Sequence, residues 1–236
     1  MKKYIYILLL FLQPVIIFAQ FAKIVDKEGN VNIRASANSN SKIIATIQSD
    51  QIIFISSKGN ENENWSQISY QQKKENIFSK YISGFIHNSK LKQITEYLLI
   101  PSVDNSEKGT VFICCNVEVE IKSGKFDFQK NKIFFKKFNG YITYKDKYAF
   151  GTLGNFPPKL NYLSITGNIE QIHFDVPKKE IENLFDLNND LSECYYDKET
   201  KTLYIILNNS DGSESYNVLF EIKNGKYKGM TTYDDY

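Results

Sequence analysis

The sequence contains few of the residues from which catalytic, metal and nucleic-acid sites are usually built. Its 236 residues include two histidines, three cysteines, one tryptophan and one arginine. Two widely separated histidines without a paired cysteine spacing leave too few soft ligands for a zinc site. No dense basic cluster is present, so the chain lacks the charge pattern of a nucleic-acid-binding protein. We therefore expect no metal, no cofactor and no nucleic-acid partner.

The residues of a cysteine hydrolase are also missing. Such an enzyme needs a thiolate at a helix start, a histidine base and an orienting polar residue. Cys114 and Cys115 instead lie within an apolar run typical of a strand, and His173 stands between Ile172 and Phe174. No pair of carboxylates is singled out for glycoside hydrolysis. We predict that the protein is not an enzyme and assign it no catalytic residues.

Two loops have the composition of ligand-binding loops without the required pattern. Residues 151–154, Gly-Thr-Leu-Gly, lead towards two prolines rather than into a helix, which excludes a phosphate-binding loop. Residues 208–214 supply several oxygen donors, yet they lack the spacing and the terminal glutamate of a calcium loop. We interpret residues 208–214 as a hairpin turn built on Asp211-Gly212.

The three cysteines allow at most one internal disulfide. Because neighbouring residues of a strand point to opposite faces, only one of Cys114 and Cys115 can face Cys194. We take Cys115 and Cys194 as the candidate pair. The alternative is that all three cysteines are small apolar core residues.

The start of the sequence has the pattern of an export signal. Met-Lys-Lys precedes an apolar run from Tyr4 to Phe18, and Ala19-Gln20 follows it. This is the basic, apolar and small-residue order of a secretory signal peptide, so we predict that residues 1–19 are removed. The run is shorter than the roughly twenty residues that span a bilayer, and no cysteine follows it to carry a lipid anchor. We expect a periplasmic or secreted protein without a stable membrane anchor after cleavage.

The remaining length and its charge distribution indicate two domains. Residues 20–95 carry ten basic and six acidic side chains, a net charge of +4, whereas residues 96–236 carry seventeen basic and twenty-one acidic side chains, a net charge of −4. A modestly basic first half suits an anionic surface such as the cell wall, and the alternative is an ordinary solvated face. The segment 96–106 contains proline and serine, so we predict a linker there, followed by a second domain over 107–236.

Short β-prone runs bounded by polar residues or glycine dominate the chain. In the first half the predicted strands are 22–25, 31–34, 42–47, 51–56, 65–70 and 82–87. In the second half they are 111–121, 126–128, 133–138, 140–150, 160–166, 169–174, 193–196, 202–207, 216–222 and 226–232. We place turns at Gly167-Asn168 and at Asn224-Gly225.

One helix is expected in the second half. Pro177 suits a first helical turn, and Ile181, Leu184 and Phe185 fall on one face, with Asp175 as the cap.

Together the strand runs and this one helix predict a mainly β protein. Its parts are a small barrel and an antiparallel sheet or sandwich domain that carries one short helix.

The first half follows the order of elements of a known family. Residues 31–34, Val-Asn-Ile-Arg, match its opening strand, and residues 65–68, Trp-Ser-Gln-Ile, match its tryptophan strand. Residues 83–87, Ser-Gly-Phe-Ile-His, match its closing segment. On these residues the segment 22–95 resembles the bacterial SH3 (SH3b) domain family. This chain departs from the family pattern in its loops: Ser49-Asp50 stands where the family often has a turn that contains glycine.

The resemblance implies a small SH3-like barrel that binds peptidoglycan peptides or protein segments. Its candidate ligand-binding residues are Trp65, Tyr70, Tyr81 and Phe85, because rigid rings offer contact area at low entropy cost. The alternative is that Trp65 supports the fold. His87 is interpreted as a hydrogen-bonded structural residue rather than a ligand or a base.

The second half resembles the C-terminal half of certain uncharacterised secreted bacterial β-rich proteins. The resemblance, over 140–236, rests on Tyr148–Gly154, Asn209–Gly212 and Lys223–Tyr227, and it implies no activity. We therefore expect a secreted, non-catalytic protein whose SH3-like module attaches to cell-wall peptidoglycan or to a protein partner. The alternatives are an immunity or inhibitor protein against a toxin or lytic enzyme, and a cell-wall hydrolase with an unrecognised catalytic C-terminal domain.

Overall fold

The computed structural model describes residues 21–58, 64–72, 80–138, 140–153, 156–209 and 215–234. The predicted signal peptide and most of the predicted turn at 208–214 lie outside the described residues. In the part of the chain that is described, the fold is mainly β, with several antiparallel sheets and little helix, which confirms the predicted fold class. None of the helices described there is long and apolar enough to cross a membrane.

Seven antiparallel strands form the N-terminal sheet, in the order β3-β2-β6-β5-β4-β1-β7. Their bounds are Phe21–Ile24 (β1), Asn30–Arg34 (β2), Ile43–Gln48 (β3), Ile52–Lys58 (β4), Trp65–Gln72 (β5), Lys80–His87 (β6) and Leu91–Gln93 (β7). Two 3-10 turns, Asn88–Lys90 (η1) and Ile94–Glu96 (η2), flank β7. The first six strands lie where the β-prone runs predicted them.

The N-terminal sheet bends around one apolar cluster. Alternate residues of β1 to β6 supply it: Ala22, Ile24, Val31, Ile33, Ile47, Ile53, Ile55, Ile68 and Ile86. At Gly84, β6 passes so close to β2 that an added Cβ would lie 2.5 Å from Cγ2 of Ile33. The pairing of Arg34 with Phe85 joins these two strands. No pairing between β3 and β7 occurs among the described residues, so this sheet wraps its core without closing into the predicted barrel.

Two five-stranded antiparallel sheets make up most of the C-terminal half. The central sheet, in the order β20-β19-β18-β17-β8, comprises Leu98–Leu99 (β8), Ser192–Asp197 (β17), Thr202–Asn209 (β18), Tyr216–Lys223 (β19) and Lys226–Asp234 (β20). The outer sheet, in the order β16-β15-β11-β10-β9, comprises Ser102–Ser106 (β9), Gly109–Cys114 (β10), Val117–Lys125 (β11), Leu160–Ile169 (β15) and Ile172–Asp175 (β16). The remaining elements are Phe128–Asn131 (α1), Lys132–Phe134 (η3), Phe135–Phe138 (β12), Tyr141–Tyr144 (β13), Lys147–Tyr148 (β14), Lys178–Ile181 (α2) and Asn189–Leu191 (η4).

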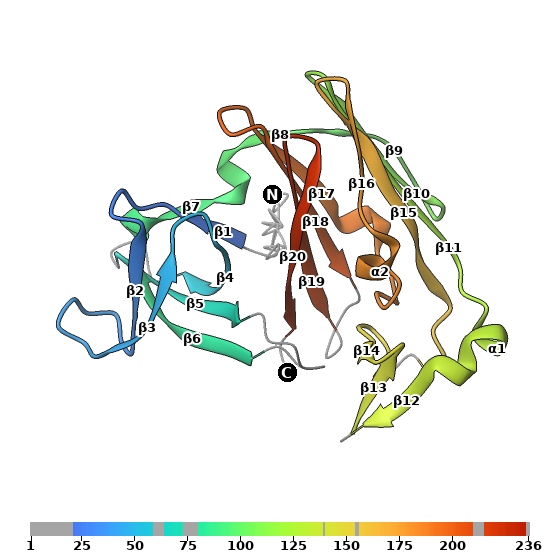
Figure 1. The fold of residues 1–236 in the computed structure, drawn as a ribbon, viewed down its shortest axis with the longest axis horizontal. Coiled ribbons are helices and arrows are strands. Elements are labelled where there is room, and N and C mark those ends of the chain that lie inside the picture. The colour runs from blue at the N-terminus through green and yellow to red at the C-terminus, as the bar shows by residue number, and fades with distance from the viewer. Residues whose placement is uncertain are drawn as a thin grey trace, which may run out of the picture.

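The central sheet lies between two other layers (Figure 1). One face packs against the outer sheet in the largest apolar cluster, to which β18 contributes Leu203, Ile205 and Leu207. The opposite face carries Tyr204 and Ile206 and packs against the N-terminal sheet. Every residue of β18 is consequently buried. Its unbroken apolar run is the pattern of a strand that is covered on both faces.

The run 111–121 forms a hairpin rather than the single strand that we predicted. β10 ends at Cys114 and β11 begins at Val117, while Cys115 and Asn116 between them have φ values of 53° and 64°. A two-residue turn of this kind needs left-handed backbone at both positions, which asparagine adopts more readily than most residues. Cysteine has no such preference for left-handed backbone, so the residue type at position 115 did not indicate a turn.

The predicted turn at 167–168 is also displaced. β15 continues through it, and the turn is formed by residues 170–171, which have φ values of 48° and 70°. Gly167 instead permits a close approach of strands, because an added Cβ would lie 2.0 Å from the carbonyl oxygen of Glu118 and 2.9 Å from the Phe174 ring.

The segment 96–106, which we predicted as a linker, contributes a strand to each of the two five-stranded C-terminal sheets. β8 pairs with β17, and β9 pairs with β10. The predicted helix is a single short turn, α2, whose N-cap is Pro177, and Asp175 ends β16 instead of capping the helix. A second short helix, α1, was not predicted, and the Asp127 side chain caps it by accepting from the Lys130 N–H.

Candidate binding groove

An apolar contact joins the N-terminal sheet to the central sheet. Phe21 of β1 and Ile52 of β4 share one buried cluster with Tyr204 and Leu219, and Phe54 packs at its margin. These N-terminal side chains point away from the core of their own sheet, because alternate residues of a strand face opposite sides. The two halves of the chain therefore meet in a buried interface.

Side chains of the N-terminal sheet also hold β20, an edge strand of the central sheet. Gln71 Nε2 donates to Thr232 Oγ1 over 2.8 Å, and the Thr232 N–H donates to Gln71 Oε1 over 3.1 Å. The Tyr81 hydroxyl donates to the Thr232 carbonyl over 3.2 Å. The Tyr233 ring stacks on Phe54 with the ring centroids 3.6 Å apart. This part of the edge is thus covered rather than open to another strand.

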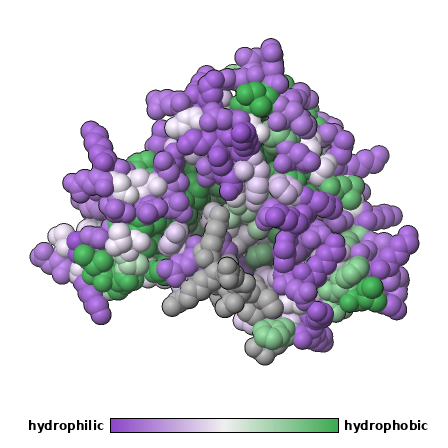
Figure 2. All heavy atoms as spheres, viewed as in Figure 1, coloured by the Kyte–Doolittle hydropathy of each residue, from purple (hydrophilic) through white to green (hydrophobic). Residues whose placement is uncertain are grey.

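A groove of about 710 Å³ lies beside this interface. One wall comes from β4 and β5 with the turn before β4, and the other comes from β19 and β20. Its polar lining includes Asp50, Gln51, Tyr70, Gln72, Glu221, Lys223 and Lys228. On the face seen in Figure 2 hydrophilic residues predominate, and hydrophobic ones are visible in the recess between the two halves.

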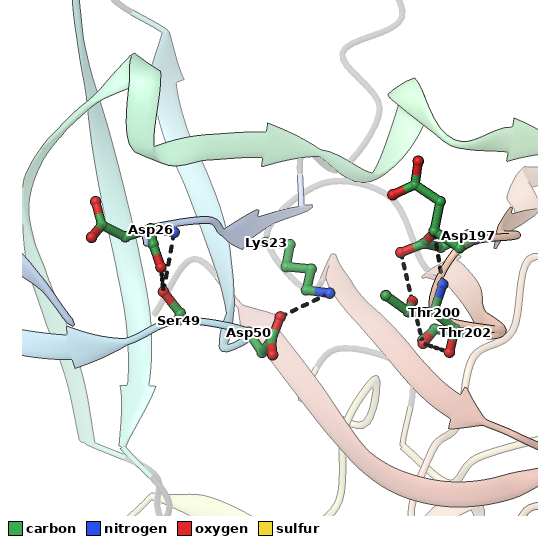
Figure 3. A network of polar contacts seen from close by, with 8 residues as sticks. Lys23, Asp26, Ser49, Asp50, Asp197, Thr200 and Thr202 are labelled. Carbon is green, nitrogen blue, oxygen red and sulfur yellow. Dashed lines mark hydrogen bonds and ion pairs between the residues drawn. The ribbon is translucent and has the colours of Figure 1, made fainter. Parts of the chain in front are cut away.

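The turn that brings Asp50 to the groove is fixed by neighbouring polar contacts. Asp50 has a φ of 68° and thus takes a left-handed conformation that glycine would adopt more readily. Ser49 Oγ accepts from the Asp26 N–H over 3.1 Å and donates to the Asp26 carbonyl over 2.8 Å (Figure 3). The Asp26 carboxylate in turn pairs with Lys90, and this hydrogen bond holds the pKa of Asp26 below its ordinary value.

Charges of both signs line the groove. The Asp50 carboxylate pairs with Nζ of the buried Lys23 over 2.9 Å (Figure 3). In the part of the chain that the structure describes, neither Lys223 nor Lys228 forms an ion pair. The wall from β19 and β20 therefore offers two ammonium groups to a ligand beside the carboxylate of Glu221, and on the other wall Asp50 is paired with Lys23.

The four aromatic residues predicted to bind a ligand do not converge on one site. Tyr70 lines the groove. Tyr81 lies on the opposite face of the β5–β6 pair, where it bonds to β20, and burial raises the pKa of its hydroxyl. Trp65 and Phe85 are half-buried nearer the other end of the same strands and do not line the groove.

His87 makes the local contacts of a structural residue. Its ring meets that of Trp65 edge-on, with centroids 5.3 Å apart. Nδ1 accepts from the Ser89 N–H over 3.3 Å and lies 2.8 Å from Ser89 Oγ. The imidazole thus caps the short turn η1.

Sequence reasoning missed the amides and lysines of the groove. Gln72 lies just beyond the predicted strand 65–70, Lys223 precedes the predicted turn at Asn224-Gly225, and Lys228 falls within the predicted strand 226–232. No local pattern marks these residues, because the walls come from distant parts of the chain. Gln71 and Thr232, which join the walls, are 161 residues apart.

The cysteines and His173 contribute nothing to the groove. All three cysteines are free, so the predicted bond between Cys115 and Cys194 is not formed in the structure. Cys194 is enclosed in the sandwich core, where burial raises the pKa of its thiol, whereas Cys115 is exposed in the β10–β11 turn. Over the described ranges, no group of three or more His, Cys, Asp or Glu residues is placed to hold a metal ion.

Comparison with known proteins assigns no family to the chain. No family model matches the sequence, and no match is found among curated proteins.

Proposed function

We propose that this protein is a secreted, non-catalytic binding protein whose groove takes a polar peptide. The peptide is a stem peptide of cell-wall peptidoglycan or an extended segment of a protein partner. In this proposal residues 22–95 act as an SH3-like module, and the central sheet supplies the second wall of its site. The observation that carries the proposal is the groove between the two halves, with Tyr70 on one wall and, on the other, two lysines that form no ion pair with any residue the structure describes.

The size and lining of the groove suit a peptide better than a small apolar ligand. Its volume of about 710 Å³ falls within the usual range for ligand sites, but those sites are mostly apolar. Here the amides of Gln51 and Gln72 offer donors and acceptors to peptide groups, and Tyr70, whose side chain packs against the core of the N-terminal sheet, lines the same wall. A peptide presents both hydrogen-bonding groups and small apolar surfaces, which matches this lining.

The charges favour a ligand that carries carboxylates. Lys223 and Lys228 lie on adjacent strands of one wall, and each can bind a carboxylate without first breaking an ion pair to another described residue. Both stem peptides and acidic protein segments have such groups. Contacts of this exposed kind contribute little energy individually, about 0.2–1 kcal/mol each, so we expect moderate affinity that weakens with salt.

Binding of the full chain to purified peptidoglycan and to soluble stem peptides tests the proposal. The variant with Lys223→Gln and Lys228→Gln should bind about three- to tenfold more weakly than the unchanged protein. Its matched control carries Lys137→Gln and Lys226→Gln, the same change of charge at exposed lysines outside the groove, and should bind normally. Equal loss in both variants would show only general charge attraction.

The two peptide sources and the hydrolase alternative give different results. Retention on peptidoglycan that soluble stem peptide competes away identifies the wall as the source. If the protein binds neither material but binds a defined partner segment, and if the variant with Lys223→Gln and Lys228→Gln binds that segment more weakly, the ligand is a protein partner. Clearing of a peptidoglycan suspension by the full chain would contradict the non-catalytic part of the proposal.

A further inference from the structure

The turn between β10 and β11 brings two thiols together. Cys114 is the last residue of β10, and Cys115 is the first of two turn residues with positive φ. On a regular strand, adjacent side chains would point to opposite faces. The left-handed backbone at Cys115 changes that direction, so that the two Sγ atoms lie 2.6 Å apart.

The pair is accessible and its turn is anchored. Cys115 is exposed, and Cys114 is partly buried against the sandwich core below it. The carbonyl of the next turn residue, Asn116, accepts from the Glu170 N–H over 2.8 Å, which ties this turn to the β15–β16 turn. Cys194, in contrast, is fully enclosed by apolar side chains. Oxidants in solution therefore reach the adjacent pair and not the third cysteine.

We propose that Cys114 and Cys115 form a reversible disulfide between adjacent residues by exchange with a disulfide compound. The Cys115 thiolate attacks one sulfur of that compound, giving a mixed disulfide and releasing the first thiol. The Cys114 thiolate then attacks Cys115 Sγ, and the second thiol leaves. Two protein thiols become one disulfide, and the disulfide compound takes up two electrons and two protons.

The covalent spacing of adjacent residues indicates why this bond is reversible. Neighbouring Cα atoms across a trans peptide are about 3.8 Å apart, and disulfides usually join Cα atoms about 4.4–6.8 Å apart. A bond outside the usual range is strained and more easily reduced. Exposed and strained disulfides belong to the labile class rather than to the structural class.

The thiol environment sets the order of attack. The hydrogen bond between Cys114 and Cys115, together with burial, raises the pKa of the Cys114 thiol, and the positive charge of Lys198 opposes that rise. Cys115 is the more exposed of the two thiols, so it is the first to meet a bulky disulfide such as oxidised glutathione.

Counting thiols in the full chain tests the proposal. The reduced protein is incubated with oxidised glutathione, unfolded without reductant and treated with iodoacetamide. Before oxidation all three cysteines should be alkylated, and after oxidation only Cys194 should be. The peptide that contains both adjacent cysteines should then be lighter by two hydrogens, and dithiothreitol should restore full alkylation.

A matched variant separates this bond from other oxidation products. Cys115→Ser lies at an exposed turn position, so the protein should fold normally, with Cys194 unreactive in the native state. After oxidation, this variant should contain no peptide with an internal disulfide. Full alkylation of the oxidised unchanged protein would overturn the proposal. A persistent glutathione adduct or a disulfide-linked dimer as the main product would overturn it equally.

Discussion

Removal of the Phe54 ring should separate the unfolding of the two halves. Phe54 projects from β4 of the N-terminal sheet, stacks on Tyr233 of β20 and meets Phe21 edge-on with ring centroids 5.4 Å apart. Because the two halves share this buried contact, they should unfold together in the unchanged protein. We expect Phe54→Ala to lower the stability of the N-terminal sheet while leaving the sandwich core intact.

The expected magnitude follows from these contacts. Two aromatic pairs contribute about 1–3 kcal/mol beyond the area they bury. The ring is half-buried, so the whole loss should be about 3 kcal/mol, at the lower end of the range for truncating a buried phenylalanine. For a urea slope typical of small domains, this loss lowers the unfolding midpoint of the N-terminal sheet by about 1–3 M.

The sole tryptophan provides a probe for one half of the molecule. Trp65 fluorescence reports on the N-terminal sheet, whereas far-UV circular dichroism reports on all strands. The two urea curves should coincide for the unchanged protein and separate for Phe54→Ala. Ile43→Ala, at a side chain that is 47% exposed on β3, is the control and should change stability by less than about 0.5 kcal/mol. Coincident curves with an unshifted midpoint for Phe54→Ala would refute the role given to the interface.

Two further predictions concern single residues. The Asp26 pKa lies below its ordinary value of 3.8, so its contribution to stability is complete above that pH and is lost as the pH falls through the folded-state pKa. Asp26→Asn should therefore lower the urea midpoint at neutral pH and have little effect in strong acid, and an equal loss at both would contradict this reasoning. Gly167→Ala should cost about 1–3 kcal/mol in thermal or urea unfolding, because its methyl group would overlap the Glu118 carbonyl. A stable variant with unchanged β11–β15 pairing would argue against that overlap.

Local patterns predicted most strands, because the alternation of apolar and polar side chains that marks a half-buried strand can be read from the sequence itself. The runs at 31–34, 65–70 and 202–207 each became a strand at the expected place. Turns were less predictable. Asn224-Gly225 formed the expected turn, but Cys115-Asn116 formed one without glycine, and Gly167 marked a close strand contact instead.

The groove was beyond local prediction for a different reason. Tyr70 was identified as a candidate from its place in the SH3-like pattern, and it lines the groove. Nothing near Lys223 or Lys228 indicates that these lysines face β5, because that placement depends on how the central sheet packs against the N-terminal sheet. The apolar run of β18 did carry part of this information, since a strand buried on both faces requires a layer on each side.

The interface between the halves has a consequence for synthesis. Phe21 and Ile52 leave the ribosome early, but their partners on β18 and β19 follow more than a hundred residues later. At ordinary elongation rates, the 161 residues between Gln71 and Thr232 take about 10–30 s to make. Throughout that interval Phe21, Ile52 and Phe54 lack the central-sheet side chains that cover them in the folded protein.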